Sequence, residues 1–184
     1  MSCPALMLGD SREEPFVGHL RLSLSGDDTW VAVAGRVAGA AGAVAAFEPA
    51  RRVEAALRAE LTPLLVKAER NLLLHRAWRA IAAMPDDALG PDAGARLSLL
   101  LVAGDLRGVG VSGVGLSMVW GRYYGRWRPL VRPAHPLLSD AGRPARPPGV
   151  LALPHKPEIL LCTPADLPGR LPADHILRRA GVYR

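Results

Sequence analysis

Apolar and polar residues alternate early in the chain, where Leu20, Leu22 and Leu24 are separated by polar side chains. Alternation with a period of two is typical of a β-strand that buries one face. The next apolar run, from Trp30 to Ala34, has almost no polar residue, which favours a central strand. The residues SGDD between the two runs are turn formers, so the segment predicts a β-hairpin.

Glycines follow this hairpin, in the run WVAVAGRVAGAAGAVAA. Gly35 and Gly39 predict a turn that leads into an alanine-rich segment able to start a helix. A strand, a glycine turn and a helix form a common frame for an anion, which the backbone amides of the turn can receive. The only charged residue of this turn is Arg36.

A helical spacing of apolar residues replaces the strand pattern over residues 48–83. A first helix is predicted from Pro49 to Leu61. Its buried face is expected to carry Val53, Leu57 and Leu61, because these positions recur every four residues.

A second helix is predicted to begin at Thr62 and to run to about Ala83. Thr62 is expected to cap it, and Pro63 to occupy its first helical position. The side chains expected to face inward are Leu65, Leu72, Leu73, Ala77 and Ile81.

Strand patterns return after the loop MPDDALGPDAG. Six segments carry them, the first two joined by the turn GDLRG: RLSLLLVAG, VGVSG, LSMVWG, RWRPLVR, GVLALP and EILLCT. With the hairpin they make about eight strands, and the helices are inserted between the second and the third. This order predicts an α+β fold in a single domain spanning residues 1–184.

Charge is unevenly distributed along the chain. Residues 1–120 hold 12 Lys or Arg and 13 Asp or Glu, a net charge of −1, whereas residues 121–184 hold 11 and 4, a net charge of +7. A basic segment attracts nucleic acid, an acidic protein or a phosphorylated partner. The interleaving of aromatic and basic residues that single-strand binders use is absent, so nucleic acid is the less favoured partner.

The remaining composition excludes several classes. No apolar run reaches the roughly 20 residues of a membrane helix, and the N-terminus has no secretory signal pattern. Cys3 and Cys162 are far apart in sequence and lack metal-ligand spacing, which argues against a disulfide framework. We expect a cytoplasmic protein with no cofactor and no membrane partner.

Five short segments follow one another in the order found in the metal-dependent serine/threonine protein phosphatases of type 2C. They are GDSREEPFVG, VAGRVAG, SGVGLSMVWG, LVRPAHPLL around His135, and ILLCTPADLPG. The chain resembles that family over residues 9–168. The resemblance implies a sandwich of two antiparallel β-sheets flanked by α-helices. The family's closing Asp-Asn segment has no counterpart, which implies a short version that lacks the terminal strand.

The resemblance also implies where the family's metal-binding aspartates would fall. These positions hold Val17, Gly35 and Pro164, unless a shift of two residues brings Asp166 into the last one. Hard divalent cations need several oxygen ligands, and Arg36 adds a permanent positive charge beside the vacated position. We interpret the chain as a pseudophosphatase, with no catalytic residue and no metal ligand.

Two arginines are the candidate anion or phosphate ligands. Arg12 matches the family arginine that meets the substrate phosphate, although an ion pair with Glu13 or Glu14 explains it as well. Arg36 either replaces the metal ions and pairs with an acid or with the ligand of Arg12, or points into solvent.

A partner surface is expected at GRYYGRWRPLVR, because aromatic residues and arginine are enriched at interface hot spots. The candidates are Tyr123, Tyr124, Arg126, Trp127 and Arg128. If this hairpin turns one face to the core, Trp127 and one tyrosine are buried instead.

These observations predict a protein-binding or regulatory module in bacterial signalling or defence, with a kinase, a phosphatase or a phosphoprotein as its partner. The alternative is an active Mn²⁺- or Mg²⁺-dependent phosphatase with a rearranged site that uses Asp10, Asp105 or Asp166. A third possibility is nucleic-acid binding through the basic segment.

Overall fold

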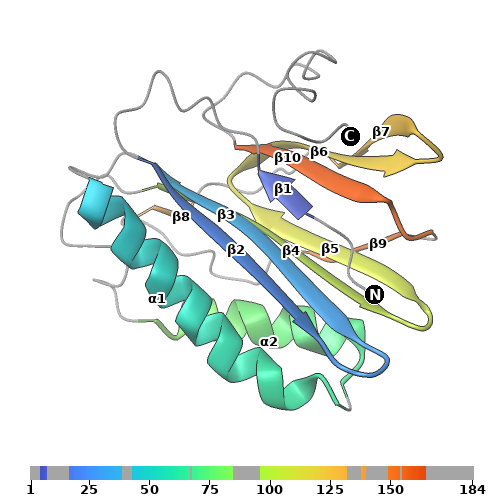
Figure 1. Ribbon diagram of the computed structural model, residues 1–184, viewed down its shortest axis with the longest axis horizontal. Helices are drawn as coiled ribbons and strands as arrows, with labels where there is room; N and C mark the ends of the chain where they lie inside the picture. The colour runs from blue at the N-terminus through green and yellow to red at the C-terminus, as the bar shows by residue number, and fades with distance from the viewer. Residues whose placement is uncertain are drawn as a thin grey trace.

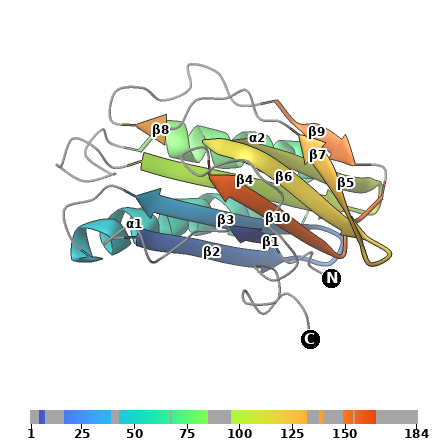
Figure 2. The same ribbon diagram turned by 90° about the horizontal axis from the view of Figure 1, so that it is seen from above.

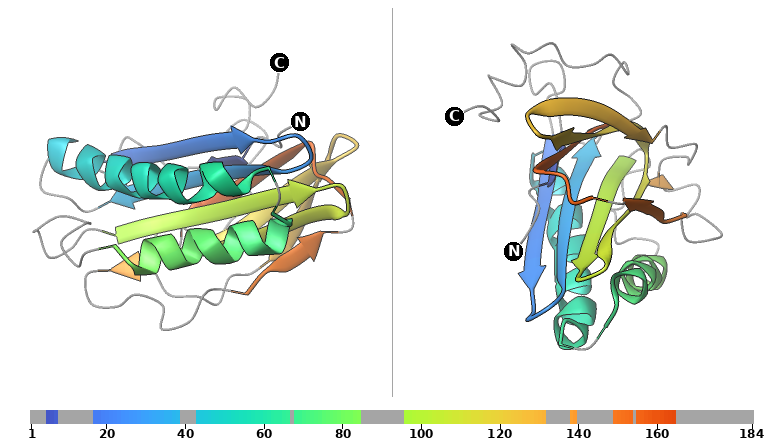
Figure 3. Two further views of the ribbon diagram at one scale, coloured as in Figure 1. Left: turned by 90° about the horizontal axis from the view of Figure 1, so that it is seen from below. Right: turned by 90° about the vertical axis from the view of Figure 1, so that its right-hand side faces the viewer.

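The computed structural model describes residues 5–7, 17–38, 43–66, 68–84, 96–131, 138–139, 149–153 and 155–164. In this part of the chain two β-sheets stack on each other, and both α-helices cover the outer face of the larger sheet (Figures 1 and 3). The elements are β1 Ala5–Met7, β2 Val17–Ser25, β3 Trp30–Ala38, α1 Ala43–Leu61, η1 Thr62–Leu64, α2 Arg70–Ala82, β4 Arg96–Asp105, β5 Gly108–Val114, β6 Leu116–Tyr123, β7 Arg126–Val131, β8 Leu138–Ser139, β9 Leu151–Leu153 and β10 Ile159–Pro164.

The predicted α+β sandwich is therefore confirmed, with the helices inserted between β3 and β4. The larger sheet has the order β2-β3-β4-β5-β9, with β8 also paired to β4, and the smaller one has the order β1-β10-β6-β7. All pairs are antiparallel except β1 with β10, which is parallel. None of the helices in the described ranges is long and apolar enough to cross a membrane.

The predicted hairpin is confirmed, and Leu20, Leu22 and Leu24 are buried beneath the helices. The turn predicted at Gly35 is wrong, because β3 continues to Ala38. Gly35 is paired on both sides, with Leu20 of β2 and with Leu99 of β4. Two partner strands satisfy its backbone groups, so the residue stays in the ladder. Gly39 lies outside the described residues.

Helix α1 begins at Ala43, before the predicted start, and Pro49 lies inside it. A proline there removes one backbone hydrogen bond, but the alanine-rich first turns have high helix propensity and continue across it. Val53, Leu57 and Leu61 are fully buried, which confirms the predicted inner face.

The second helix begins later than predicted, at Arg70 instead of Thr62. The Thr62 hydroxyl donates a 2.7 Å hydrogen bond to the carbonyl of Arg58, in the last turn of α1, and Thr62–Leu64 form a single 3₁₀ turn. Helix α2 instead starts where the Arg70 backbone N–H reaches the Asp105 carboxylate, at 3.3 Å. A cap supplied from 35 residues away leaves no local signature in the sequence.

The inner face of α2 also differs from the prediction at one position. Leu72 is 46% exposed, whereas the helix buries Leu73, Leu74, Ala77, Trp78 and Ile81. Because Leu74 and Trp78 are buried in place of Leu72, the buried face of α2 is rotated slightly about the helix axis from the predicted one. The reason lies in β5, where Trp78 Nε1 donates a 2.9 Å hydrogen bond to Ser112 Oγ.

Two apolar layers result from this stacking. One lies between the helices and the larger sheet, and the other lies between the two sheets. Strand β4 contributes side chains to both layers, because Leu99 and Leu101 face the helices while Leu100 and Val102 face the smaller sheet. The continuous apolar run of this strand is what a strand covered on both faces requires.

Candidate functional site

Arg36 lies on β3 and faces the space between the two sheets. Neighbouring side chains along a strand alternate between faces, and Val33 and Val37 face the helices while Ala34 packs in the layer between the sheets. Arg36 falls on the same face as Ala34, and only 1% of it is exposed. The alternative that Arg36 points into solvent is therefore wrong.

Arg36 has a polar residue on each neighbouring strand. It pairs with His19 of β2 on one side and with Ser98 of β4 on the other. Ser98 is buried, and its hydroxyl donates a 2.8 Å hydrogen bond to the carbonyl of Gly115. His19, Arg36 and Ser98 thus form a row across three strands on the face that looks toward the smaller sheet.

Partial burial of His19 lowers its pKa below the usual 6.5, and the positive charge of Arg36 lowers the pKa further. Both effects disfavour the protonated imidazole. The row therefore contains a fixed cation, Arg36, and a histidine that is held toward its neutral form.

Sequence reasoning named Arg36 but missed His19 and Ser98, which carry no motif. A signal for His19 was present, because the turn that pairs Ser25 with Trp30 also sets His19 opposite Arg36. In an antiparallel hairpin each step away from the turn moves one residue back and one forward, so the turn decides every later pair.

The three positions matched to metal-binding aspartates lie on three different strands, β2, β3 and β10. Val17 pairs with Ala38, and Pro164 pairs with Leu116, the residue after the Gly115 that Ser98 contacts. A side chain at position 35 would point into the layer beneath the helices. There a Cβ would lie 2.8 Å from Leu99 Cδ1 and 3.2 Å from Leu20 Cβ.

Of the other sequence candidates, the structure describes Asp105. Arg12, His135, Asp10 and Asp166 are outside the described residues. Asp105 lies at the opposite end of β4 from the Arg36 row, where it pairs with Gly108. Within the described ranges, no group of three or more His, Cys, Asp or Glu side chains could hold a metal ion.

Asp105 joins three segments. Its Oδ1 accepts hydrogen bonds from Arg70 Nη1 at 2.7 Å, from the Arg107 backbone N–H at 2.8 Å and from the Gly108 backbone N–H at 3.1 Å. Burial raises the pKa of this carboxyl, but the hydrogen bonds and charge from Arg70 and the bond from Arg107 outweigh burial and leave the pKa lowered. Asp105 therefore has a structural role: its donors keep the carboxylate ionised, and it links the start of α2 to the β4–β5 turn.

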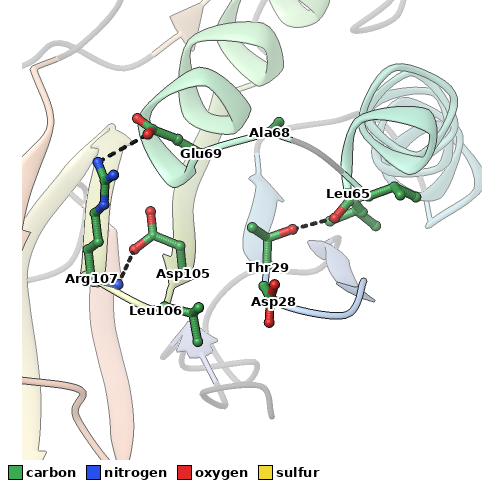
Figure 4. Close-up of a pocket in the computed structure, with 9 residues that line it drawn as sticks. Asp28, Thr29, Leu65, Ala68, Glu69, Asp105, Leu106 and Arg107 are labelled. Atoms are coloured by element: carbon green, nitrogen blue, oxygen red, sulfur yellow. Dashed lines mark hydrogen bonds and ion pairs between the residues drawn. The ribbon is translucent and has the colours of Figure 1, made fainter.

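A cleft of about 200 Å³ lies beside Asp105 (Figure 4). Its lining residues are Asp28, Thr29, Leu65, Val66, Ala68, Glu69, Asp105, Leu106 and Arg107. Thr29 Oγ1 donates a 2.6 Å hydrogen bond to the Leu65 carbonyl, and Arg107 Nη1 lies 3.1 Å from Glu69 Oε1. These contacts tie the β2–β3 and β4–β5 turns to the connection between the helices, so we assign the cleft to packing of the loops.

The candidate partner residues lie on the β6–β7 hairpin, at the upper right of Figure 1, and the structure divides them. Tyr123 pairs with Arg126 around a two-residue turn, and Gly121 pairs with Arg128 two steps further, so Tyr123, Arg126 and Arg128 share one face. Trp127 faces the other way, opposite Arg122.

Tyr124 occupies the tip of this hairpin. It adopts a φ of +50° and Gly125 a φ of +75°, the left-handed pair typical of a tight hairpin turn. Its side chain is 93% exposed, whereas Tyr123 and Trp127 are half-buried. The exposed candidates are therefore Tyr124 together with the two arginines, Arg126 and Arg128.

No protein-family model matches the chain, and a search of curated proteins finds no significant match. Among solved structures, the chain is similar to the PP2C phosphatase domain with a regulatory-domain fragment of SpoIIE, a cell fate determinant of Bacillus subtilis. The TM-score is 0.46 at 10% identity, over 76% of this chain and 43% of that one. The chain thus spans less than half of the SpoIIE chain.

A second similar structure is the catalytic domain of the serine threonine protein phosphatase PstP in complex with two manganese ions. Here the TM-score is 0.47 at 17% identity, over 76% of this chain and 73% of that one. Both likenesses concern the fold. The activity and the manganese belong to those proteins and are not transferred to this chain.

Proposed function

We propose that this chain is a phosphatase-like domain without metal-dependent phosphatase activity, and that it works as a protein-binding or regulatory module. The observation that carries the proposal is the buried guanidinium of Arg36 between the two sheets, in a row with His19 and Ser98. The proposed setting is bacterial signalling or defence.

The electrostatic argument concerns what this row can hold. A divalent cation needs several oxygen ligands, and a charge that repels it makes binding still less favourable. A guanidinium carries a permanent positive charge at physiological pH. The same positive charge that disfavours protonation of His19 also disfavours Mn²⁺ or Mg²⁺ beside it.

The proposed partner surface is the tip and one face of the β6–β7 hairpin. Tyr124, Arg126 and Arg128 are exposed there. A tyrosine ring supplies apolar area at low entropic cost, and arginine binds carboxylates and phosphates with two parallel hydrogen bonds. This combination suits an acidic or phosphorylated protein, such as a kinase, a phosphatase or a phosphoprotein.

The first test is a calorimetric titration with Mn²⁺ and with Mg²⁺, with hydrolysis of p-nitrophenyl phosphate measured on the same sample. We expect no binding heat and no turnover. Micromolar Mn²⁺ binding with turnover would contradict the proposal. If Asp166→Asn abolished that turnover, the rearranged metal site would be established instead.

The partner surface is tested separately by fluorescence anisotropy with a phosphothreonine peptide and its unphosphorylated form. We expect tighter binding of the phosphopeptide, and a weakening of about tenfold or more in the double variant Arg126→Glu, Arg128→Glu. The double variant Arg51→Glu, Arg52→Glu is the matched control, because both are exposed arginines on α1 and the change in net charge is the same. Equal weakening by the control would show that only net charge matters.

A further inference from the structure

Strand β2 forms one margin of the larger sheet. It spans nine residues without a proline and, within the described ranges, pairs only with β3. Figure 2 shows β2 at this margin. A long edge strand presents unpaired backbone N–H and C=O groups that can pair with another chain.

The hairpin register shows which groups face outward. Gly26 N–H donates a 2.8 Å bond to the Thr29 carbonyl at the turn. In antiparallel pairs, hydrogen-bonded and non-bonded positions alternate. Starting from this turn, the residues of β2 whose backbone groups point away from β3 are His19, Arg21, Ser23 and Ser25. All four are exposed.

The outer strands of the smaller sheet and the far edge of the larger one are less suited to pairing. Strands β1 and β9 have only three residues each. Strand β7 contains Pro129, which lacks the N–H that an added strand would need. Among the described outer strands, β2 is therefore the one best able to accept a partner strand.

The charges of this hairpin distinguish possible partners. His19 and Arg21 lie in the first half of β2, and Asp27 and Asp28 follow in the turn. In a second copy that runs antiparallel, with Ser23 beside its counterpart, Arg21 lies opposite Ser25. The turn that carries Asp27 and Asp28 follows the end of that strand, so it lies next to Arg21 and His19 of the other copy. No two like charges then face each other, and the two-fold symmetry makes each contact twice.

We propose that β2 pairs with β2 of a second copy of this chain, antiparallel and centred on Ser23, to join two larger sheets into one continuous sheet. The proposal does not depend on the proposed function. It assigns this margin to self-association and leaves the β6–β7 hairpin available, because that hairpin belongs to the other sheet.

The test is sedimentation velocity over about 1 μM to about 1 mM protein. We expect a concentration-dependent dimer, and a monomer for Ser23→Pro. The Ser23 N–H points outward, so a proline at this edge position leaves the β2–β3 ladder intact. An unchanged far-ultraviolet circular dichroism spectrum and melting temperature check that this variant is folded.

A charge exchange tests the register. Arg21→Glu and Asp27→Arg should each weaken the dimer on the order of tenfold, and the double variant should restore it. Arg51→Glu on α1 serves as the control for net charge and should leave the dimer unchanged. A wild-type protein that stays monomeric to about 1 mM, or a dimer that Ser23→Pro does not disturb, overturns the proposal.

Discussion

His19 and Arg36 lie directly opposite each other on β2 and β3, and partial burial together with the Arg36 charge lowers the pKa of His19. The pair places a fixed positive charge and a titratable ring on the face that looks toward the smaller sheet. The Cβ atoms of direct cross-strand neighbours lie about 5 Å apart, so the two side chains start close to each other.

We expect the pKa of His19, measured from its imidazole resonances by NMR, to lie below 6.5. Arg36→Met should raise this pKa part of the way back, because burial is the larger cause and remains. An unchanged pKa in Arg36→Met would show that the arginine charge does not reach the ring.

The same pair gives a pH dependence of stability. The folded state binds the His19 proton less tightly than the unfolded state, so the free energy of unfolding should fall as pH drops below 6.5. Urea denaturation from neutral to mildly acidic pH measures this slope. His19→Gln should flatten the slope in this window, and an equal slope in both proteins would assign it to other groups.

Gly35→Asp tests the direction of position 35. The carboxylate would enter the apolar layer against Leu99 and Leu20, so we expect a loss of about 3 kcal/mol or more and no gain in Mn²⁺ binding. Gly35→Ala is the matched control, with an expected loss of about 1 kcal/mol from tight packing. Equal stability of the two variants, measured by urea denaturation, would mean that the side chain reaches water.

Asp105→Asn tests the contribution of the Asp105–Arg70 contacts at the start of α2. The variant loses the negative charge that accepts the 2.7 Å hydrogen bond from Arg70 Nη1. We therefore expect the free energy of unfolding to fall by about 2 kcal/mol. The lowered pKa of Asp105 implies stability that is present above pH 3.8 and lost as pH falls through the folded pKa. The amide of the variant does not titrate in this range, so that part of the acid dependence should disappear.

Asp28→Asn is the control for this change in charge, since Asp28 is an exposed residue of the neighbouring turn. We expect a change within about 0.5 kcal/mol. If both variants lose equal stability in urea denaturation, the effect of Asp105 comes from net charge and not from its hydrogen bonds.

Trp78 and Ser112 join α2 to β5 through one buried hydrogen bond of 2.9 Å. Trp78→Phe and Ser112→Ala should each cost about 1 to 3 kcal/mol, because each leaves a buried polar group with one partner fewer. The double variant should cost less than the sum, with a coupling of about 1 kcal/mol. Strict additivity in urea denaturation would show that the bond contributes nothing beyond packing.

The sequence by itself determined the features that depend on local order. The β2–β3 hairpin follows from alternation around a turn, and the buried face of α1 follows from the spacing of Val53, Leu57 and Leu61. These features need only neighbours along the chain.

Tertiary structure alone decided where α2 begins, because Asp105 caps it from a distant strand. It also kept Gly35 in an extended ladder, since strands on both sides offered hydrogen bonds that a turn would have given up. It buried Arg36 between two sheets whose stacking no local pattern encodes. Contacts between segments far apart in sequence supply the free energy in each case, and local propensity is too weak to oppose them.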